Sequence, residues 1–473
     1  KKSDFQSYYV DYVIDSVIAD LRSQLGYTLQ QATNKIYYGG LKIYTAVDLD
    51  VQKHLEDVYY NRVTFPKQED TPEKPAVQSA MTILDYEERI VGIIGGAGEK
   101  KANRSLNRAA YSPRQPGSTI KPLAVYSPAI EMNSINWSTM ILNYAFPYKG
   151  MKMWPKNFDD TFGSNSPVSI QYALQESLNT VSARVVVDIV TAPQSVRFLQ
   201  EKYHISTVDR VNDANHAPMA VGAMSKGITT MEMAAAYATF GNGGKYYKPY
   251  AYYKVTDRNG REVFLENKPQ GEQVINPATA DVMCELLQTV KTTHYGKGAN
   301  VRKFQIMAKT GTTDNNFDRW LVAGTPYYIA ASWYGYDKPK IIRDNPNPAG
   351  RVLIEVFDRI HKDLEPKKFE KSGLTVQKKY CASSGLLASD KCTSTKLGWY
   401  KLNALPEVCT DCSKPLIEEV YDAFGNLINQ IIGNDTTKPS NPTTSSPTTT
   451  MPQGTTKPPV STTPPTTAKP QTP

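Results

Sequence analysis

The sequence lacks several features that would direct it to particular functions. It has no run of about 18 apolar residues, the length that crosses a bilayer as a helix. Its five histidines show no metal-ligand spacing, and the glycine-rich stretch 92–98 lacks the Lys-Ser/Thr ending of a phosphate loop. We therefore expect no transmembrane helix in these residues, no nucleotide loop, no cofactor, and no metal in the functional site.

The composition is that of a globular protein with a modest positive charge. The chain has 473 residues, of which 40% are hydrophobic and 21% charged, with a formal net charge of +8. This length favours two or three structural units. Lysine pairs such as Lys367-Lys368 are interpreted as solvated faces, so we expect no nucleic-acid partner. An anionic cell envelope would suit the charge better.

The chain divides into four segments by composition. Residues 1–40 are predicted to be an interdomain linker, with helical spacing of apolar residues over residues 3–34. Residues 41–365 form the main domain, and residues 366–433 a small C-terminal domain. Residues 434–473 are dominated by Thr, Pro and Ser, a composition that cannot bury enough apolar surface to fold. We predict a disordered tail there.

Within the main domain the pattern predicts a sheet packed with helices beside an all-helical lobe, with the site between the two. The region from Ser118 to about Gly241 is predicted to be mostly helical, interrupted by a loop over Tyr148–Pro167. Predicted strands are Leu41–Thr45, Ala80–Tyr86, Ile90–Gly95, Tyr246–Val255, Arg261–Leu265, Phe304–Ala308 and Tyr327–Tyr334. Predicted helices are Asp48–Tyr60, Pro277–Lys291 and Leu353–Leu364.

The tetrad Ser118-Thr119-Ile120-Lys121 is the strongest candidate for chemistry. It follows Pro116-Gly117, a break after which a helix can start. Residues three apart share a helix face, so the Lys121 amine is expected beside the Ser118 hydroxyl. A serine hydroxyl is a weak nucleophile until an adjacent base takes its proton. The tetrad therefore predicts an activated serine.

Two further motifs follow in a fixed order. Ser177-Leu178-Asn179 lies between two predicted helical stretches, and Lys309-Thr310-Gly311-Thr312 follows a predicted strand. Ser-x-x-Lys, Ser-x-Asn and Lys-Thr-Gly together are the signature of penicillin-binding proteins and serine β-lactamases. Each of the last two is weak alone, and the ordered set is much more specific.

With its flanking segments, the sequence resembles the transpeptidase domain of class A penicillin-binding proteins, the bifunctional peptidoglycan synthases. The resemblance covers roughly residues 1–430. It implies an α+β fold of the serine β-lactamase/transpeptidase type, an antiparallel sheet flanked by helices with an all-helical lobe. The flanking segments that carry it are Gly40–Asp48 with Gln52, Gly222–Ala234, Tyr237–Gly244, Asp318–Pro326 and Trp333–Asp337.

The resemblance also implies a role for each motif residue in acyl transfer from a D-Ala-D-Ala stem peptide. Ser118 would be the nucleophile and Lys121, as the neutral amine, its base. Burial and the nearby cation of Lys309 would both favour that neutral form. Ser177 would relay the proton to the leaving amine, and Asn179 would hold Lys121 and contact the substrate amide.

The third motif is implied to bind the substrate. Lys309 would attract the terminal carboxylate, with the Thr310 and Thr312 hydroxyls as hydrogen-bonding candidates. Gly311, without a side chain, would let the substrate lie against the strand edge. The oxyanion would sit between the backbone N–H groups of Ser118 and Thr312.

The same resemblance implies the setting. The partners would be peptidoglycan stem peptides, β-lactams, and other cell-wall synthesis and division proteins. We expect the chain to be a fragment from the extracytoplasmic face of a bacterial cell membrane. Its membrane anchor and glycosyltransferase domain would precede the first residue.

Two other functions use the same nucleophile. A D,D-carboxypeptidase or β-lactamase would deliver water to the acyl-enzyme, and a non-enzymatic sensor domain would simply be acylated by β-lactams. Class A β-lactamases carry a Glu-x-x-x-Asn deacylation loop, and we identify no such pattern between Ser177 and Lys309. The leading prediction is the transpeptidase.

Four of the five cysteines gather in the predicted C-terminal domain. Cys381 and Cys392 are followed by Cys409-x-x-Cys412, and only this second pair has the spacing of a zinc site. Disulfides are favoured outside the membrane. We favour two disulfides, with three possible connectivities, over zinc. Cys284 is interpreted as a small core residue.

Overall fold

The computed structural model describes residues 5–66, 71, 75–292 and 298–412. These residues all belong to one compact unit. The predicted disordered tail, 434–473, and the end of the predicted C-terminal domain lie outside the described residues. No helix within the described ranges is long and apolar enough to cross a membrane.

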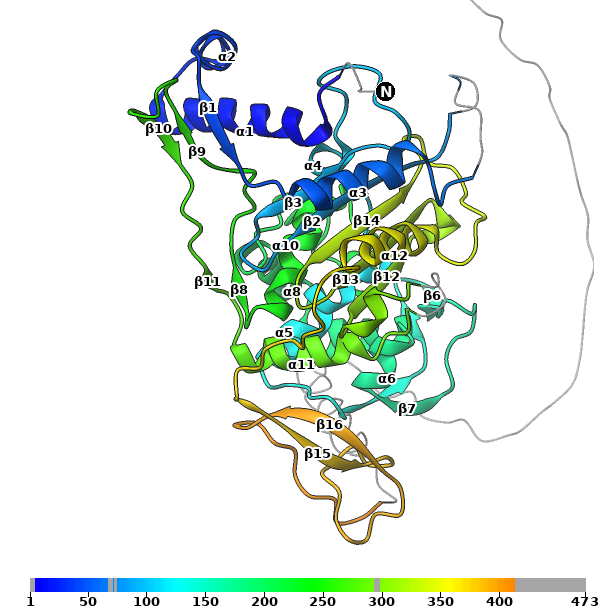
Figure 1. Cartoon of the computed structure of the whole chain (residues 1–473). Coiled ribbons are helices and arrows are strands. Elements are labelled where there is room, and N and C mark those ends of the chain that lie inside the picture. Colours follow the sequence, from blue (N-terminus) through cyan, green and yellow to red (C-terminus); the bar gives the residue numbers. More distant parts are fainter. Residues whose placement is uncertain (1–4, 67–70, 72–74, 293–297, 413–473) are drawn as a thin grey trace, which may run out of the picture. The chain divides into compact units, whose positions relative to one another are not determined.

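A five-stranded antiparallel sheet forms the centre of the fold (Figure 1). Its strand order is β12-β13-β14-β2-β3, so β12 lies at one edge. The bounds are β2 Gln78–Leu84, β3 Ile90–Ile94, β12 Met307–Thr312, β13 Asp318–Gly324 and β14 Ile329–Gly335. The central strands β13 and β14 are buried along almost their whole length, because helices cover both faces.

Twelve α-helices surround this sheet and build the lobe beside it in the described part of the chain. They are α1 Tyr8–Leu25, α2 Leu29–Tyr38, α3 Leu49–Tyr60, α4 Arg108–Tyr111, α5 Ser127–Glu131, α6 Ile170–Gln175, α7 Asn179–Arg184, α8 Ala192–Glu201, α9 His216–Val221, α10 Thr230–Gly241, α11 Pro277–Gln288 and α12 Pro348–Ile360. Helices α3 and α12 contact each other and cover one face of the sheet, where their apolar side chains form a separate core cluster.

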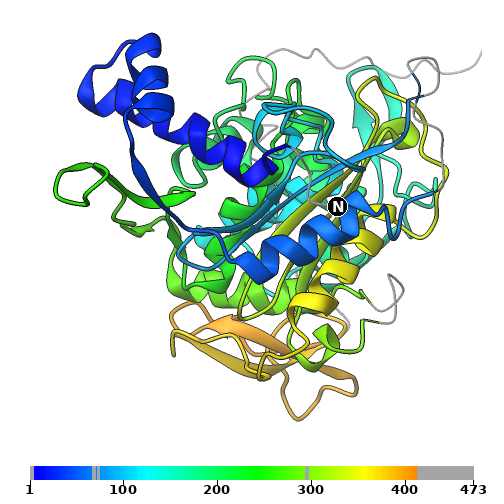
Figure 2. The ribbon, with the colours of Figure 1, turned by 45° about the horizontal axis from the view of Figure 1, so that its top comes forward.

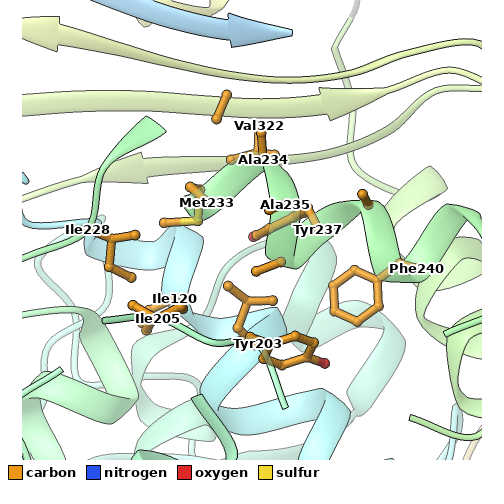
Figure 3. Packing of buried hydrophobic residues seen from close by; sticks show 14 of the residues in the cluster. Ile120, Tyr203, Ile205, Ile228, Met233, Ala234, Ala235, Tyr237, Phe240 and Val322 are labelled. Carbon is orange, nitrogen blue, oxygen red and sulfur yellow. The ribbon is translucent and has the colours of Figure 1, made fainter. Parts of the chain in front are cut away.

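Helix α10 lies against the other face of the sheet and is buried on nearly all sides. Four alanines let its backbone pack closely, and a capping box of Thr229 and Glu232 fixes where it begins. Phe240 of α10 packs edge-on against Tyr203 of the helical lobe, with their ring centroids 6.1 Å apart (Figure 3). The helix therefore joins the sheet to the lobe through one continuous apolar core.

Smaller sheets complete the fold. Strands β1 Lys42–Thr45, β9 Tyr252–Thr256 and β10 Val263–Glu266 form a three-stranded sheet near α1 and α2 (Figure 2). The two-stranded sheets pair β8 Lys245–Tyr246 with β11 Glu272–Gln273, β4 Met140–Asn143 with β7 Ser166–Ser169, β5 Phe146–Tyr148 with β6 Met151–Trp154, and β15 Thr375–Cys381 with β16 Thr395–Lys401.

Several predicted elements need correction. Residues 3–34, where apolar residues recur at helical spacing, belong to two helices rather than one. Gly26 ends α1 in the left-handed conformation, and a capping box of Thr28 and Gln31 starts α2. The predicted loop over Tyr148–Pro167 contains β6 and the start of β7, so the lobe is helical apart from two small sheets. These strands are short and partly polar, which hides their period-two pattern.

Two strand predictions were also misplaced. Tyr246–Val255 is two strands, β8 and β9, in different sheets; Pro249 lies between them and cannot donate to a ladder. The strand predicted at Phe304–Ala308 instead runs from Met307 to Thr312, so the Lys-Thr-Gly motif lies within β12. Helix α12 begins at Pro348, five residues before the predicted Leu353, since Asn347 caps it.

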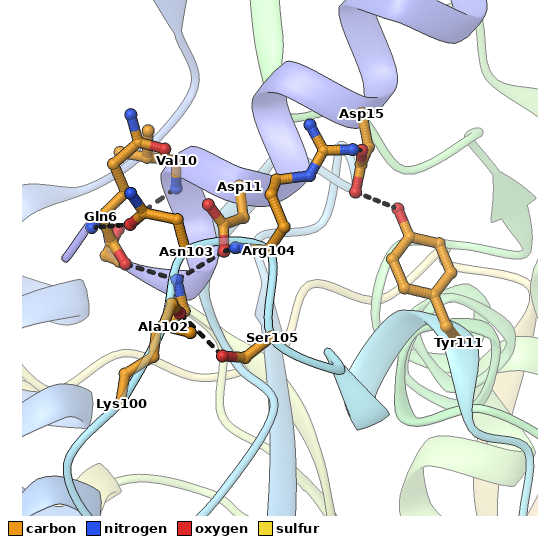
Figure 4. A network of polar contacts seen from close by, with 11 residues as sticks. Gln6, Val10, Asp11, Asp15, Lys100, Ala102, Asn103, Arg104, Ser105 and Tyr111 are labelled. Carbon is orange, nitrogen blue, oxygen red and sulfur yellow. Dashed lines mark hydrogen bonds and ion pairs between the residues drawn. The ribbon is translucent and has the colours of Figure 1, made fainter.

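The predicted linker helix α1 is attached to the sheet region by a buried ion pair. Lys100 Nζ donates to Asp11 Oδ2 at 2.5 Å, and both side chains are almost fully buried. Lys100 Nζ also donates to the Gln6 carbonyl at 2.6 Å, and the Arg104 backbone N–H donates to Asp11 Oδ2 at 2.8 Å (Figure 4). Asp11 Oδ2 therefore keeps these partners only while the 100–104 loop stays in place, and Asp11 Oδ1 is buried without a hydrogen bond to the described residues.

Removing one partner of this pair should destabilise the protein strongly. Lys100→Met leaves the Asp11 carboxylate buried without its cation, a change that typically costs about 3–5 kcal/mol. Urea unfolding should show this loss, whereas the matched variant Lys101→Met, at an exposed position, should unfold like wild type. Equal stability of the two variants would mean that α1 is held by its apolar face alone.

Candidate active site

Ser118 lies in a tight turn where the chain enters the core. Gly117 has a left-handed φ of +52° and begins a 3-10 turn over Gly117–Ile120. In such a turn residues three apart lie above one another, so Ser118 and Lys121 share a face. Among the residues that the structure describes, the Ser118 hydroxyl has no hydrogen-bond partner, and its side chain is only half-buried. The hydroxyl is thus available to a substrate.

Three side chains hold the backbone of this turn. The Trp320 indole N–H of β13 donates to the Gln115 carbonyl at 2.8 Å. The Thr119 hydroxyl donates to the Pro116 carbonyl at 2.7 Å, and the Tyr237 hydroxyl of α10 donates to the Thr119 carbonyl at 2.6 Å. Sheet and central helix therefore fix the position of Ser118 together.

Glycines let three backbone segments meet at the turn. A Cβ on Gly117 would lie 2.4 Å from the Thr312 carbonyl oxygen, and one on Gly311 would lie 2.3 Å from the Pro116 carbonyl oxygen. A Cβ on Gly222 would lie 2.1 Å from the Gly117 carbonyl oxygen. Because none of these positions can carry a side chain without displacement, the turn packs directly on β12.

The Lys121 amine is fully buried and points to the second motif. Its Nζ donates to the Ser177 backbone carbonyl at 2.7 Å and to Asn179 Oδ1 at 2.6 Å. Burial, and then the charge of Lys309, hold the pKa of Lys121 well below its ordinary value. A π-helical segment, Pro122–Tyr126, follows directly. Such irregular turns occur frequently at functional sites.

Ser177 stands at the junction between α6 and α7 with a left-handed φ of +58°. Asn179 begins α7, where its backbone N–H donates to Asn157 Oδ1 at 2.8 Å and its amide donates to the Lys156 carbonyl at 2.8 Å. Asn157 in turn donates to Asn143 Oδ1 at 3.2 Å. This asparagine network holds the second motif against Lys121.

Lys309 reaches the same junction from the edge strand. Its Nζ donates to Ser177 Oγ at 2.7 Å and to the Thr310 carbonyl at 3.2 Å. Burial lowers the pKa of Lys309 to about 7. On the same strand the Thr312 hydroxyl accepts from the Arg319 guanidinium at 3.1 Å.

The structure thus brings Lys121, Ser177, Asn179 and Lys309 into one hydrogen-bonded cluster, with the Ser118 turn packed on β12 beside it. The hydroxyls of Ser118 and Thr310 form no hydrogen bond with the described residues. Sequence reasoning gave no role to the supporting residues Asn143, Asn157, Gly222, Trp320 and Arg319, although the last three lie in segments that carry the resemblance. Gly222 also had a local signal, because a glycine directly after an apolar helical stretch marks a left-handed helix end.

The expectation that no Glu-x-x-x-Asn pattern lies between the second and third motifs is wrong, because the string occurs at Glu272–Asn276. Glu272 lies exposed in β11 with its carboxylate 3.1 Å from His204 Nε2. Asn276 caps α11, and its backbone N–H donates to Glu131. Neither residue contacts the cluster, so the string does not form a deacylation loop against it.

The fold and the site define a class: an α+β domain of the serine β-lactamase/transpeptidase type, with its three motifs meeting at the edge of the sheet. The model of the penicillin binding protein transpeptidase domain matches residues 80–342, which include all three motifs. The chain therefore belongs to the penicillin-binding protein transpeptidase family, and the predicted fold class is confirmed.

Individual relatives agree. The chain is 29% identical over 421 residues to penicillin-binding protein 1A of Clostridium tetani, a match covering 84% of this chain and 53% of that protein. Penicillin-binding protein 1A of Clostridium acetobutylicum is 32% identical over 375 residues, covering 76% of this chain and 45% of that protein. The chain thus spans about half the length of these curated relatives.

A solved structure shows the same fold. The crystal structure of penicillin-binding protein 1A from Haemophilus influenzae superimposes with a TM-score of 0.69 at 18% identity. The match covers 86% of this chain and 77% of that one. The resemblance to class A penicillin-binding proteins drawn from the motifs is confirmed.

The close approach at Gly222 gives a test of how the turn is built. Gly243→Ala introduces the same left-handed strain, at φ +76° against +82°, but its Cβ would meet nothing within 4 Å. That strain alone should cost roughly 1–2 kcal/mol. Gly222→Ala should cost about 1–3 kcal/mol more, since its methyl must displace the Gly117 carbonyl. Urea unfolding of both variants measures the difference, and equal losses would contradict the packing.

Proposed function

We propose that this chain is a peptidoglycan D,D-transpeptidase that cross-links stem peptides through a serine acyl-enzyme and is acylated covalently by β-lactams. One observation carries the proposal: two buried lysine amines flank Ser177 beside a half-exposed serine. Lys121 bonds the Ser177 carbonyl and Lys309 bonds the Ser177 hydroxyl, each at 2.7 Å. Family membership supports an acyltransferase; the residue roles are inferred from the geometry.

Lys121 serves as the base. A neutral amine has two N–H donors and one lone pair, and both donors are directed to Ser177 O and Asn179 Oδ1. The lone pair is left to accept the proton of Ser118, which lies one turn earlier. The lowered pKa of Lys121 supports the neutral form at physiological pH.

Acylation then proceeds with balanced proton transfer. As the Ser118 oxygen attacks the carbonyl carbon of the penultimate D-Ala, its proton passes to Lys121. The C–N bond breaks as the Ser177 hydroxyl gives its hydrogen to the nitrogen of the departing terminal D-Ala. The Ser177 oxygen takes a proton in turn from the Lys309 ammonium, which donates to it at 2.7 Å. This hydroxyl accepts from Lys309, so its own hydrogen remains free to donate. An acceptor amine later attacks the ester and releases Ser118 by the reverse transfers.

The edge strand holds the substrate. An extended stem peptide can add to the free edge of β12 beside Gly311. Lys309, when cationic, has three N–H donors, of which two are used within the protein, so one remains for the terminal carboxylate. The Thr310 and Thr312 hydroxyls are further candidates, and the N–H groups of Ser118 and Thr312 would receive the oxyanion.

The setting of the whole protein follows from its relatives. Because the curated relatives are about twice as long as their match to this chain, we propose that the complete protein also carries a glycosyltransferase domain and a membrane anchor. It would act at the extracytoplasmic face of a bacterial membrane with other cell-wall synthesis and division proteins. Residues 1–40 would then be the interdomain linker and 366–433 the small C-terminal domain.

Penicillin labelling tests the function directly. After incubation with benzylpenicillin, intact-mass analysis should show one penicilloyl group per chain, and peptide mapping should place it on Ser118. Ser118→Ala should not be labelled, whereas Ser105→Ala, at a half-buried loop position, should be labelled normally. An adduct at any other residue would remove the assignment of the nucleophile.

The same adduct separates the competing functions. No glutamate carboxylate of the described residues hydrogen-bonds to the cluster, so water attack should be slow and the adduct should persist for many minutes, far longer than ordinary enzyme turnover. With a thioester stem-peptide analogue, an added D-amino acid should compete with water for the acyl group. Rapid, sustained hydrolysis of penicillin would favour a β-lactamase, and the absence of transfer to any amine would favour a sensor.

The carboxylate role of Lys309 has its own test. Lys309→Met should slow acylation by benzylpenicillin by about a hundredfold, equivalent to roughly 3 kcal/mol of lost charge-assisted bonding. The methyl ester of benzylpenicillin lacks the anionic group, so it should acylate the wild-type protein more slowly than benzylpenicillin does. The Lys309→Met substitution should change the rate of acylation by this ester much less. Equal loss with both substrates would show that Lys309 acts through Ser177 or the fold rather than through the carboxylate.

A further inference from the structure

The C-terminal hairpin β15–β16 presents a second cluster of chemically reactive side chains. The hairpin packs against the body of the domain: Lys401 Nζ donates to the Ile130 carbonyl at 2.8 Å, and the Tyr400 hydroxyl donates to Ser138 Oγ at 2.8 Å. Its loops are irregular (Figure 1), and the first contacts the domain through Ser138 Oγ, which donates to the Gly385 carbonyl at 2.6 Å. The end of β15 and the loops carry four cysteines.

These four cysteines converge on one point. Cys381 ends β15, Cys392 lies in the loop before β16, and Cys409 and Cys412 follow β16. All four Sγ atoms lie within 4.8 Å of one another. The measured separations are 3.9 Å between Cys409 and Cys412 and 3.7 Å between Cys392 and Cys412.

The two disulfides favoured from the sequence are not present, because the structure has all four as free thiols. Disulfide pairing would divide the sulfurs into two bonded pairs. The structure instead arranges them around a common centre, with Cys381 and Cys409 buried and the other two half-buried. The prediction of disulfides was based on the oxidising conditions expected outside the membrane and did not take this geometry into account.

We propose that Cys381, Cys392, Cys409 and Cys412 bind one zinc ion. With Zn–S bonds of about 2.3 Å, tetrahedral geometry sets the sulfurs about 3.8 Å apart. The Cys409–Cys412 and Cys392–Cys412 separations of 3.9 and 3.7 Å match this value, and all four sulfurs lie within 4.8 Å of one another. Four thiolates and no open position define a structural site rather than a catalytic one. On binding, each of the four thiols releases its proton to solvent. Four thiolates around one Zn²⁺ then form a centre of net charge −2.

The surroundings of the sulfurs fit this centre. The Ser384 hydroxyl donates to Cys409 Sγ at 3.2 Å, and the Ser389 backbone N–H donates to Cys392 Sγ at 3.4 Å. Such donors stabilise the negative charge that thiolates share with the metal. The Cys409 backbone N–H donates to the Leu387 carbonyl at 2.8 Å, which holds the last loop beside the turn after β15.

The segment also needs such a clamp. Between residues 375 and 412 the buried hydrophobic residues are Tyr380, Tyr400, Cys381 and Cys409, too few for an independent core. Residues 382–394 and 402–412 have no strand or helix of their own within the described chain. One ion bonded to both loops and to the end of β15 supplies the cross-link that apolar packing does not.

The test measures the metal content of the intact chain. The protein is purified without chelator, and no reducing agent is added before the analysis. Elemental analysis should give one zinc per chain, and intact mass should show no loss of hydrogens from disulfide formation. Replacement by Co²⁺ should produce the visible bands of tetrahedral thiolate coordination. Removing zinc with a strong chelator should lower the melting temperature of the hairpin and expose residues 382–412 to proteases.

Variants locate the site. Cys392→Ser and Cys412→Ser, at half-buried positions, should each reduce bound zinc at least tenfold. Cys284→Ser is the matched control, because this cysteine lies in α11 and bonds only Gln288, and it should retain one zinc. Co²⁺ titration of wild type gives a readout that does not depend on the variants folding.

Two results would overturn the proposal. A chain lighter by four hydrogens, with no zinc and no reactive thiol at these positions, would establish two disulfides instead. Iron with its thiolate charge-transfer colour would replace zinc as the resident metal. Neither result bears on Ser118, so failure here is separate from failure of the proposed acyl transfer.

Discussion

The structure of the site depends on the burial of two lysine amines beside one serine. Lys121 and Lys309 are both almost fully buried, and each is bonded to a different oxygen of Ser177. Two ammonium groups so close in an apolar environment would repel each other and lose their hydration. The fold resolves this by favouring a neutral amine, and a neutral amine is what proton abstraction from a serine requires.

The rest of the domain holds that pair in place. Lys121 comes from the turn that Trp320 and Tyr237 fix, Ser177 from a strained junction between two helices, and Lys309 from the edge strand. Each of the three segments belongs to a different part of the fold. Because Gly117 and Gly311 let the backbones of the turn and the edge strand touch, a small displacement of either segment would change both lysine environments together.

Much of this was predictable from sequence, for identifiable reasons. The motif residues were found because acyl transfer demands particular groups at short spacing, and the sheet strands because long apolar runs bounded by turns are easily recognised. The limits of β12 were not predicted correctly, because Lys309–Thr312 have little apolar character. These residues lie at the strand edge that faces the proposed substrate path. Asn143 and Asn157 were missed because their support of Asn179 arises only from tertiary contact. The convergence of four cysteines has the same cause: the first and the last are 31 positions apart in the sequence, and only the fold brings them together.

The protonation state of Lys121 is the most direct test of the account. Nitrogen-15 NMR of lysine-labelled protein, with Lys121→Met used to assign the Nζ resonance, reports whether the amine is neutral. We expect the neutral amine near neutral pH, with its titration shifted well below that of exposed lysines, and a rise in that pKa when Lys309 is replaced by methionine. A Lys121 Nζ that remains cationic up to the pH at which exposed lysines titrate would contradict the central claim.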